Sequence, residues 1–148
     1  MTDPQWAVQV ALVKRLEAIA TAAGERVYDD VPPEADRINA TGAAFPYISL
    51  GTGSLVPIDE EHFDRSQLDQ EINVWSREVG FSEAKRIAGE IRMALHEQDL
   101  SIEGHVCDRM RVESVNQMRD PDGKTRRMRI SLSIETQPAA PVDVPPAP

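Results

Sequence analysis

The pattern that most constrains the fold is a strict alternation of apolar and polar residues near the end of the chain. Every second residue of Arg127–Glu135 is apolar, and charged or hydroxyl residues fill the positions between them. Successive side chains of a β-strand point to opposite faces, so this pattern predicts a strand with one buried and one polar face. Gln67–Trp75 alternates in the same way, and Phe45–Leu50 is rich in β-branched and aromatic residues. A sheet built from such strands needs helices over its apolar face.

Two segments have the apolar spacing of such helices. The first begins with Asp3 as a candidate N-cap and Pro4 at the first helical position, and Gly24 is a C-terminal stop signal. The second follows Gly80, with Ser82 as its N-cap and His96 in its last turn, where a polar or cationic side chain suits the helix dipole. Apolar residues recur every three or four positions in both: Val8, Leu12, Leu16, Ile19 and Ala23, then Phe81, Ala84, Ala88, Ile91 and Leu95.

The other segments complete an α+β order. Arg26–Asp29 is a short extended piece, Glu34–Ala44 is expected to be a loop, and Gly51–Ser54 is expected to break the strand before it. His105–Arg119 is a long strand whose apolar phase slips between Val112 and Val115, which indicates a bulge. The sequence Asp120-Pro121-Asp122-Gly123 is a turn signal. We therefore expect an antiparallel sheet of about four to five strands with two helices packed on one face.

The domain boundaries follow from composition. Residues 1–135 form one α+β domain, and the proline- and alanine-rich residues 136–148 are expected to be a disordered tail. The N-terminus lacks the basic and apolar regions of a secretory signal, and no apolar run has the length of a membrane span, so a cytosolic protein is expected.

Charge is distributed unevenly along the chain. The net charge is −9, which disfavours general attraction to nucleic acid or membranes. Residues 1–104 carry 9 Lys and Arg against 19 Asp and Glu, a balance of −10, whereas residues 105–135 carry 7 against 5, a balance of +2. This split fits either an ordinary solvated surface or two complementary edges that meet between copies. The polar face of the sheet likewise faces either solvent or another copy.

Several residues are candidates for chemical groups. His105 and Cys107 form an HxC pair without a second pair nearby, and Cys107 as a nucleophile needs His62 or His96 as its base. The acidic stretch Asp59–Asp64 lacks the spacing of a calcium loop and is expected to be the exposed loop of a hairpin. Phosphate-loop, dinucleotide-binding, zinc-protease and serine-hydrolase motifs are all missing. The sequence therefore predicts no catalytic, cofactor or metal residues, and no enzyme.

The last two strands form a basic hairpin. Its cations have no interleaved aromatic residues, so it is not a stacking platform for single-stranded nucleic acid, and no specific nucleic-acid binding is expected. It is either a charged edge that discourages aggregation, a loose phosphate contact, or a contact for the acidic loop of another subunit. The cations are Lys124, Arg126, Arg127 and Arg129, with Arg109, Arg111 and Arg119 on the partner strand.

The order of short segments resembles a known family. A short N-terminal helix leads to Arg26–Asp29 with Val31-Pro32, then Phe45–Gly51, then Val74–Arg77. A helix ending in Ala94-Leu95-His96 and a hairpin around Asp120–Gly123 follow. This arrangement, over roughly residues 5–135, is similar to the tail-completion, or tail-terminator, proteins of long-tailed phages, prophages and gene transfer agents.

The resemblance implies a structural virion protein without catalytic residues or cofactors. It implies a homo-oligomeric ring, usually a hexamer, that caps the tail tube and joins it to the head-side neck, or stopper, protein. The expected location is the head-tail junction of a virion or phage-like particle, with assembly in the host cytoplasm. We hypothesise that Lys124, Arg126 and Arg127 contact an acidic surface, Asp59–Glu61, of a neighbouring subunit. The alternatives are a small regulatory or nucleic-acid-binding module that uses the basic hairpin, and a thiol enzyme that uses Cys107.

Overall fold

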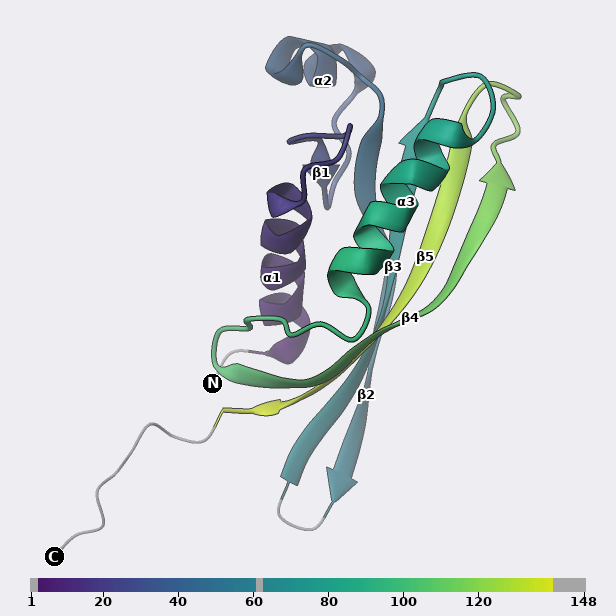
Figure 1. Cartoon of the computed structure of the whole chain (residues 1–148). Helices are drawn as coiled ribbons and strands as arrows, with labels where there is room; N and C mark the ends of the chain where they lie inside the picture. The colour runs from purple at the N-terminus through teal and green to yellow at the C-terminus, as the bar shows by residue number, and fades with distance from the viewer. Residues whose placement is uncertain (1–2, 61–62, 140–148) are drawn as a thin grey trace, which may run out of the picture.

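A computed structural model describes residues 3–60 and 63–139, with three helices and one five-stranded sheet (Figure 1). The helices are α1 (Pro4–Ala18), α2 (Glu34–Thr41) and α3 (Ser82–Leu95). The strands are β1 (Val27–Tyr28), β2 (Tyr47–Glu60), β3 (Phe63–Ser76), β4 (His105–Arg119) and β5 (Arg126–Pro138). The predicted α+β class is confirmed.

The sheet has the strand order β1-β2-β3-β5-β4. The consecutive pairs β2–β3 and β4–β5 are antiparallel, as expected for strands joined by short links, and the non-consecutive pair β3–β5 is antiparallel as well. The two-residue β1 is the exception, because it pairs parallel to β2 and is connected to it through α2. β2 and β3 form a long hairpin that projects past the helices, whereas the turn between β4 and β5 lies at the other end of the sheet (Figure 1).

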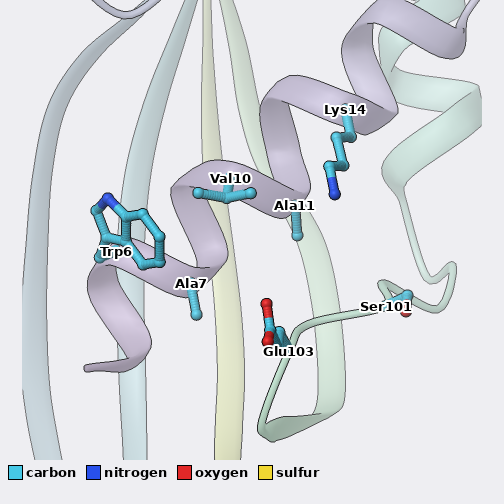
Figure 2. A pocket seen from close by; sticks show the side chains of 7 residues that line it. All are labelled: Trp6, Ala7, Val10, Ala11, Lys14, Ser101 and Glu103. Carbon is cyan, nitrogen blue, oxygen red and sulfur yellow. The ribbon is translucent and has the colours of Figure 1, made fainter. Parts of the chain in front are cut away.

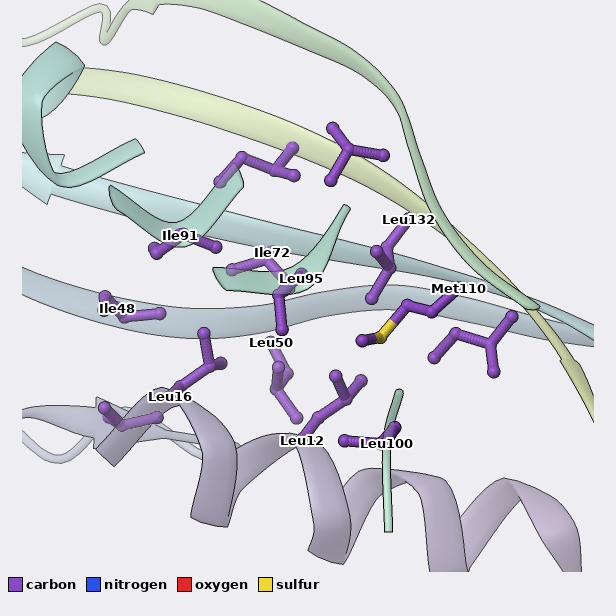
Figure 3. Packing of buried hydrophobic residues seen from close by; sticks show 14 of the residues in the cluster. Leu12, Leu16, Ile48, Leu50, Ile72, Ile91, Leu95, Leu100, Met110 and Leu132 are labelled. Atoms are coloured by element: carbon purple, nitrogen blue, oxygen red, sulfur yellow. The ribbon is translucent and has the colours of Figure 1, made fainter. Parts of the chain in front are cut away.

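The core lies between one face of the sheet and the helices α1 and α3 (Figure 3). Leu12 and Leu16 of α1 and Ile91 and Leu95 of α3 have no exposed surface, and neither have Ile72 and Ile130 of the sheet. Burying one such side chain stabilises a fold by about 1.5–3 kcal/mol. The predicted inward residues of β5 are all buried, and α3 adds Ile87, which the predicted stripe omitted.

Several local predictions are confirmed. The Asp3 carboxylate accepts a hydrogen bond from the Trp6 backbone N–H at 3.4 Å, and Pro4 occupies the first turn of α1. The β4–β5 register shifts between Val112 and Ser114, where the bulge was expected, and shifts again between Cys107 and Arg109. The turn after β4 is closed by the Gly123 N–H, which donates to the Asp120 carbonyl at 3.1 Å.

The prediction of a loop over Glu34–Ala44 is wrong, because Glu34–Thr41 forms α2. Its first turn carries acidic residues, which favour the positive end of the helix dipole. It ends at Gly42, whose left-handed φ of 87° lets its N–H bond the Ile38 carbonyl. These capping signals outweigh the polar, small-residue composition that favoured a loop.

The ends of the two long helices also differ from the prediction. α1 stops at Ala18, and the following residues form a separate turn in which the Gly24 N–H bonds the Thr21 carbonyl at 3.0 Å. Ala23 in that turn still fills the core. At α3 the N-cap is Phe81, without a side-chain cap bond, rather than Ser82. His96 is the C-cap, and its Nδ1 accepts the Val112 backbone N–H at 3.0 Å instead of facing the helix end.

The predicted break at Gly51–Ser54 is wrong as well. β2 runs through it to Glu60, and the glycines accommodate a register shift between Leu50 and Gly53. A Cβ atom at Gly51 would lie 2.7 Å from Asn73 Nδ2 and still closer to the Glu71 carboxylate, so a larger residue would require these two side chains to move. Asp59 and Asp64 are paired strand residues and not a loop. Of the predicted acidic loop, Glu61 and His62 lie outside the described residues.

The last strand is longer than predicted. β5 continues past Glu135 to Pro138, Thr136 is buried, and the Gln137 amide donates to Asp108 Oδ1 at 2.8 Å. The tail prediction for residues 140–148 lies outside the described residues.

Candidate assembly surfaces

The sheet places the two predicted contact segments at opposite ends. Asp59 and Glu60 end β2, and the exposed Asp64 lies opposite Asp59 in the ladder; we call this end the acidic tip. Lys124 and Arg126 lie at the β4–β5 turn, where Arg126 pairs with Ser76 of β3. Ser76 is the twelfth residue after Asp64 in β3, which corresponds to about 40 Å of strand. The two segments therefore cannot meet within one subunit, but they can meet between copies.

The cations at the β4–β5 turn differ in how accessible they are. Lys124 and Arg119 are exposed, whereas Arg126 is half-buried. The Arg126 guanidinium lies 5.7 Å from the centre of the Phe81 ring, and its Nη1 donates to the Gly123 carbonyl at 3.1 Å. We call Lys124, Arg119 and Arg126 the basic end.

Arg127 is held by its own subunit. Its Nε donates to Asn73 Oδ1 at 2.8 Å, its Nη2 lies 3.5 Å from Glu71 Oε2, and its guanidinium stacks 5.0 Å from the Trp75 ring centre. Arg129 Nε lies 3.5 Å from the other oxygen of Glu71. The side chain of Arg127 is therefore 24% exposed, because the alternation of β5 points it onto the polar face beside β3.

Arg127 is one member of a chain of stacked aromatic rings and guanidinium groups on the polar face. Trp75 stacks on Tyr47 with ring centres 6.0 Å apart, and Tyr47 contacts Phe45 at 5.2 Å. The guanidinium of Arg37 lies 4.5 Å from the centre of the Tyr47 ring, and that of Arg77 lies 4.5 Å from the centre of the Phe45 ring. Each such cation–π contact is worth about 0.5–1 kcal/mol at an exposed site and more when desolvated. We call these residues the arginine–aromatic ladder.

Arg37 anchors α2 to this ladder. It is only 6% exposed, and it donates to the Ala44 carbonyl at 3.1 Å and the Pro32 carbonyl at 2.6 Å. Burial raises the pKa of the Tyr47 hydroxyl above its ordinary value of 10.0, although the neighbouring Arg37 and Arg77 lower it. The ladder thus connects α2 to the polar face of the sheet through Arg37 and Tyr47. The sequence analysis did not predict the arginine–aromatic ladder, because Glu34–Thr41 was expected to be a loop. The aromatic residues at positions 45, 47 and 75 are the sequence feature that could have indicated it.

Among the described residues no hydrogen bond joins Cys107 to a histidine, and the other candidate base, His62, lies outside them. Burial raises the pKa of the Cys107 thiol, which opposes formation of the nucleophilic thiolate. His105 is buried with its Nδ1 3.1 Å from the Glu103 carbonyl, and His96 Nδ1 bonds the β4 backbone. Over residues 3–60 and 63–139, no three His, Cys, Asp or Glu side chains gather as a metal site needs. Within the same ranges no helix has the length and apolar character to cross a membrane.

The sequence matches one protein-family model. The model is that of the tail completion protein gp17, and the match spans residues 9–137, which includes nearly every element of the fold. The chain belongs to this family. It is therefore a structural tail protein of the phage type, and the resemblance stated from the sequence is confirmed. No significant match is found among curated proteins.

Solved structures share the fold. One is a chain from the virion of a native gene transfer agent particle, 24% identical, with a TM-score of 0.79 over 93% of this chain and 99% of that chain. A second solved chain is 16% identical, with a TM-score of 0.51 over 94% of this chain and 98% of that chain. At these identities the likeness concerns the fold, and the gene transfer agent chain is the more similar of the two.

Proposed function

We propose that the protein caps the tail tube of a phage-like particle as a homo-oligomeric ring of six subunits. In this proposal one side of the ring contacts the tail-tube protein and the other contacts the head-side neck protein. The ring is assembled in the host cytoplasm and stays at the head-tail junction. It acts by recognition and capping rather than by catalysis.

The observation that carries the proposal is the family match over residues 9–137. The solved relative from a gene transfer agent virion supports it, because that chain is itself part of a phage-like particle and has the same fold. For the present protein, the location in a particle and the contacts with tail and neck proteins are inferences from that likeness.

The geometry of the sheet supports assembly into a ring. In a ring, one surface of each subunit contacts a different, complementary surface of the next subunit. Such head-to-tail contacts produce a closed ring when the rotation between neighbouring subunits brings the last copy back to the first. The acidic tip and the basic end are such a pair: they carry opposite charge and lie about 40 Å apart along β3. We propose that the acidic tip, together with the adjacent Glu61, contacts Lys124 and Arg126 of the next subunit. The contacts of Arg127 within its own subunit assign it a supporting role instead.

Deletion of the gene tests the function itself. Particles made without the protein should contain tails of uncontrolled length and heads without tails, and a plasmid copy should restore joined particles of uniform tail length. Normal tails and joined particles in the deletion strain would refute the proposed function.

Charge reversal tests the surfaces. Lys124→Glu with Arg119→Glu should prevent complementation, because like charges facing each other across an interface cost several kcal/mol. The matched control is Lys85→Glu with Arg86→Glu, which reverses two exposed cations on α3 and should complement normally. Adding Asp59→Lys and Asp64→Lys to the first variant should restore assembly in part. Full complementation by the first variant would exclude the basic end as a contact.

A further inference from the structure

A groove of about 330 Å³ lies between α1 and the loop that follows α3 (Figure 2). The small side chains of Ala7 and Ala11 leave the space open, and the loop after α3 closes it with Ser101 and Glu103. The remaining lining residues are Trp6, Val10 and Lys14 of α1. Figure 2 shows these residues in sequence along the helix, with Glu103 beneath Ala7 and Ala11.

Trp6 gives this groove the chemistry of a peptide-binding site. Its side chain is 60% exposed, so the core does not explain a tryptophan at this position. An exposed aromatic ring beside an apolar groove is how many domains bind proline-rich segments in the polyproline II conformation. That conformation is already extended, so binding it costs little further ordering of the peptide.

A proline-rich segment of the same chain begins at the mouth of the groove. Residues 140–148 read APVDVPPAP, with four prolines. The last described residue, Ala139, donates its N–H to the Gly104 carbonyl at 3.0 Å, next to Glu103. Pro138 and Pro4 line one small hollow, so the chain leaves β5 beside the N-terminus of α1.

Length and charge fit this occupant. Nine residues in the polyproline II conformation span about 28 Å, whereas Trp6 and Lys14 are separated by about 12 Å along the helix axis. Asp143 is the single charged residue of the segment, and it is four residues, or about 12 Å, beyond Ala139. Lys14 is exposed and, among residues 3–60 and 63–139, makes no ion pair.

We propose that residues 140–148 bind back into this groove of the same subunit. The prolines pack against Trp6 and Val10, and Asp143 lies beside Lys14. The segment thereby covers the exposed tryptophan of α1. This inference rests on the groove and on the exit point of the chain, and it does not depend on the proposed ring.

The two tryptophans of the chain provide a signal and its internal control. The Trp75 indole donates to Ser49 Oγ at 2.9 Å on the polar face of the sheet, remote from the groove. The Trp6 and Trp75 indole N–H resonances, assigned with Trp6→Phe, are compared in the full chain and in a chain that ends at Ala139. The shorter chain keeps every described helix and strand.

The Trp6 signal should shift on truncation while the Trp75 signal stays in place, and the shift should be independent of protein concentration. A synthetic peptide of residues 140–148 added to the shorter chain should return the Trp6 signal toward its full-chain position. Lys14→Glu should weaken that peptide about two- to fivefold, the size of an exposed ion pair, and Lys85→Glu on α3 should leave it unchanged.

Two results would overturn the proposal. An identical Trp6 signal in both chains would show that the segment does not occupy the groove. A shift that grows with protein concentration would show that the occupant is the segment of another copy.

Discussion

Replacement of Arg127 by glutamate separates a structural role from a contact role for this residue. The sequence alone predicts an exposed contact cation at this position, for which Arg127→Glu should change assembly and leave the fold intact. The structure predicts the opposite order of effects. Arg127 bonds Asn73, lies beside Glu71 and stacks on Trp75, so the substitution should first destabilise the fold.

The magnitude follows from the contacts that are lost. A hydrogen bond to a charged group contributes about 1.5–3 kcal/mol, and the stacking on Trp75 adds about 0.5–1 kcal/mol. The new carboxylate would also face Glu71, which already neutralises Arg129. Because such contributions do not add fully, we expect a loss of about 2–4 kcal/mol in the free energy of unfolding. For a domain of this size that corresponds to a fall in Tm of roughly 6–15 °C.

Thermal and urea unfolding, followed by circular dichroism, measure this loss directly. Lys124→Glu is the matched control, because Lys124 is an exposed cation of the same hairpin and its replacement should change the free energy of unfolding by less than about 0.5 kcal/mol. If Arg127→Glu melts like Lys124→Glu, the arginine–aromatic ladder does not support the fold, and Arg127 is available to a neighbouring subunit after all.

Three further predictions concern the core, the turn and the thiol. Ile91→Ala should lower the free energy of unfolding, measured in urea, by about 2–5 kcal/mol because Ile91 is fully buried. Met93→Ala on the same helix should be close to neutral because Met93 is 81% exposed. A similar loss for both variants would mean that the buried face of α3 is misassigned. Hydrogen bonds from Thr125 and from the Lys124 N–H lower the pKa of Asp122 from 3.8 to about 2, so the stability that the Asp122 carboxylate contributes is complete above pH 3.8 and is lost as the pH falls toward 2. The difference in urea midpoint between the wild type and Asp122→Asn should therefore shrink over that range. A difference that stays constant with pH would contradict this role of the Asp122 carboxylate. Since burial raises the pKa of Cys107, iodoacetamide at neutral pH should alkylate it more slowly than a cysteine in a short peptide, and faster alkylation would reopen a thiol-based activity.

The amphipathic elements could be predicted from the sequence because their periodicity records which face is buried. The alternation of β5 and the apolar spacing of α1 identify the residues of the core, and the slip in apolar phase near Val112 identifies a bulge. In each case the pattern of apolar residues within the segment itself predicts the buried face, and the tertiary structure buries that same face.

The errors arose where composition is a weaker signal than a helix end or a side-chain contact. The polar, small-residue composition of Glu34–Thr41 favours a loop, yet α2 forms with acidic residues in its first turn and Gly42 at its end, and Arg37 holds it against the rings of Phe45 and Tyr47. Gly51 was interpreted as a strand break, but it is the point where the Glu71 and Asn73 side chains of β3 approach the β2 backbone. The Gly51 contact depends on the pairing of β2 with β3, which no local pattern specifies.

The sequence predicts the charge of the two candidate surfaces but not where they lie in the fold. The split between an acidic first part and a basic hairpin is visible in the sequence, whereas the separation of the two segments by the length of β3 follows from the strand order. The register also shows which cations are free for a partner: Lys124 projects from the turn, while Arg127 is directed onto β3.

The central claim, that this protein forms the ring at the head-proximal end of the tail, is tested most directly by cryo-electron microscopy of complete particles. We expect one closed ring of six copies between the tail tube and the neck, with the acidic tip of each subunit against the basic end of the next. Density for this protein along the length of the tube, or particles that lack the protein altogether, would contradict it.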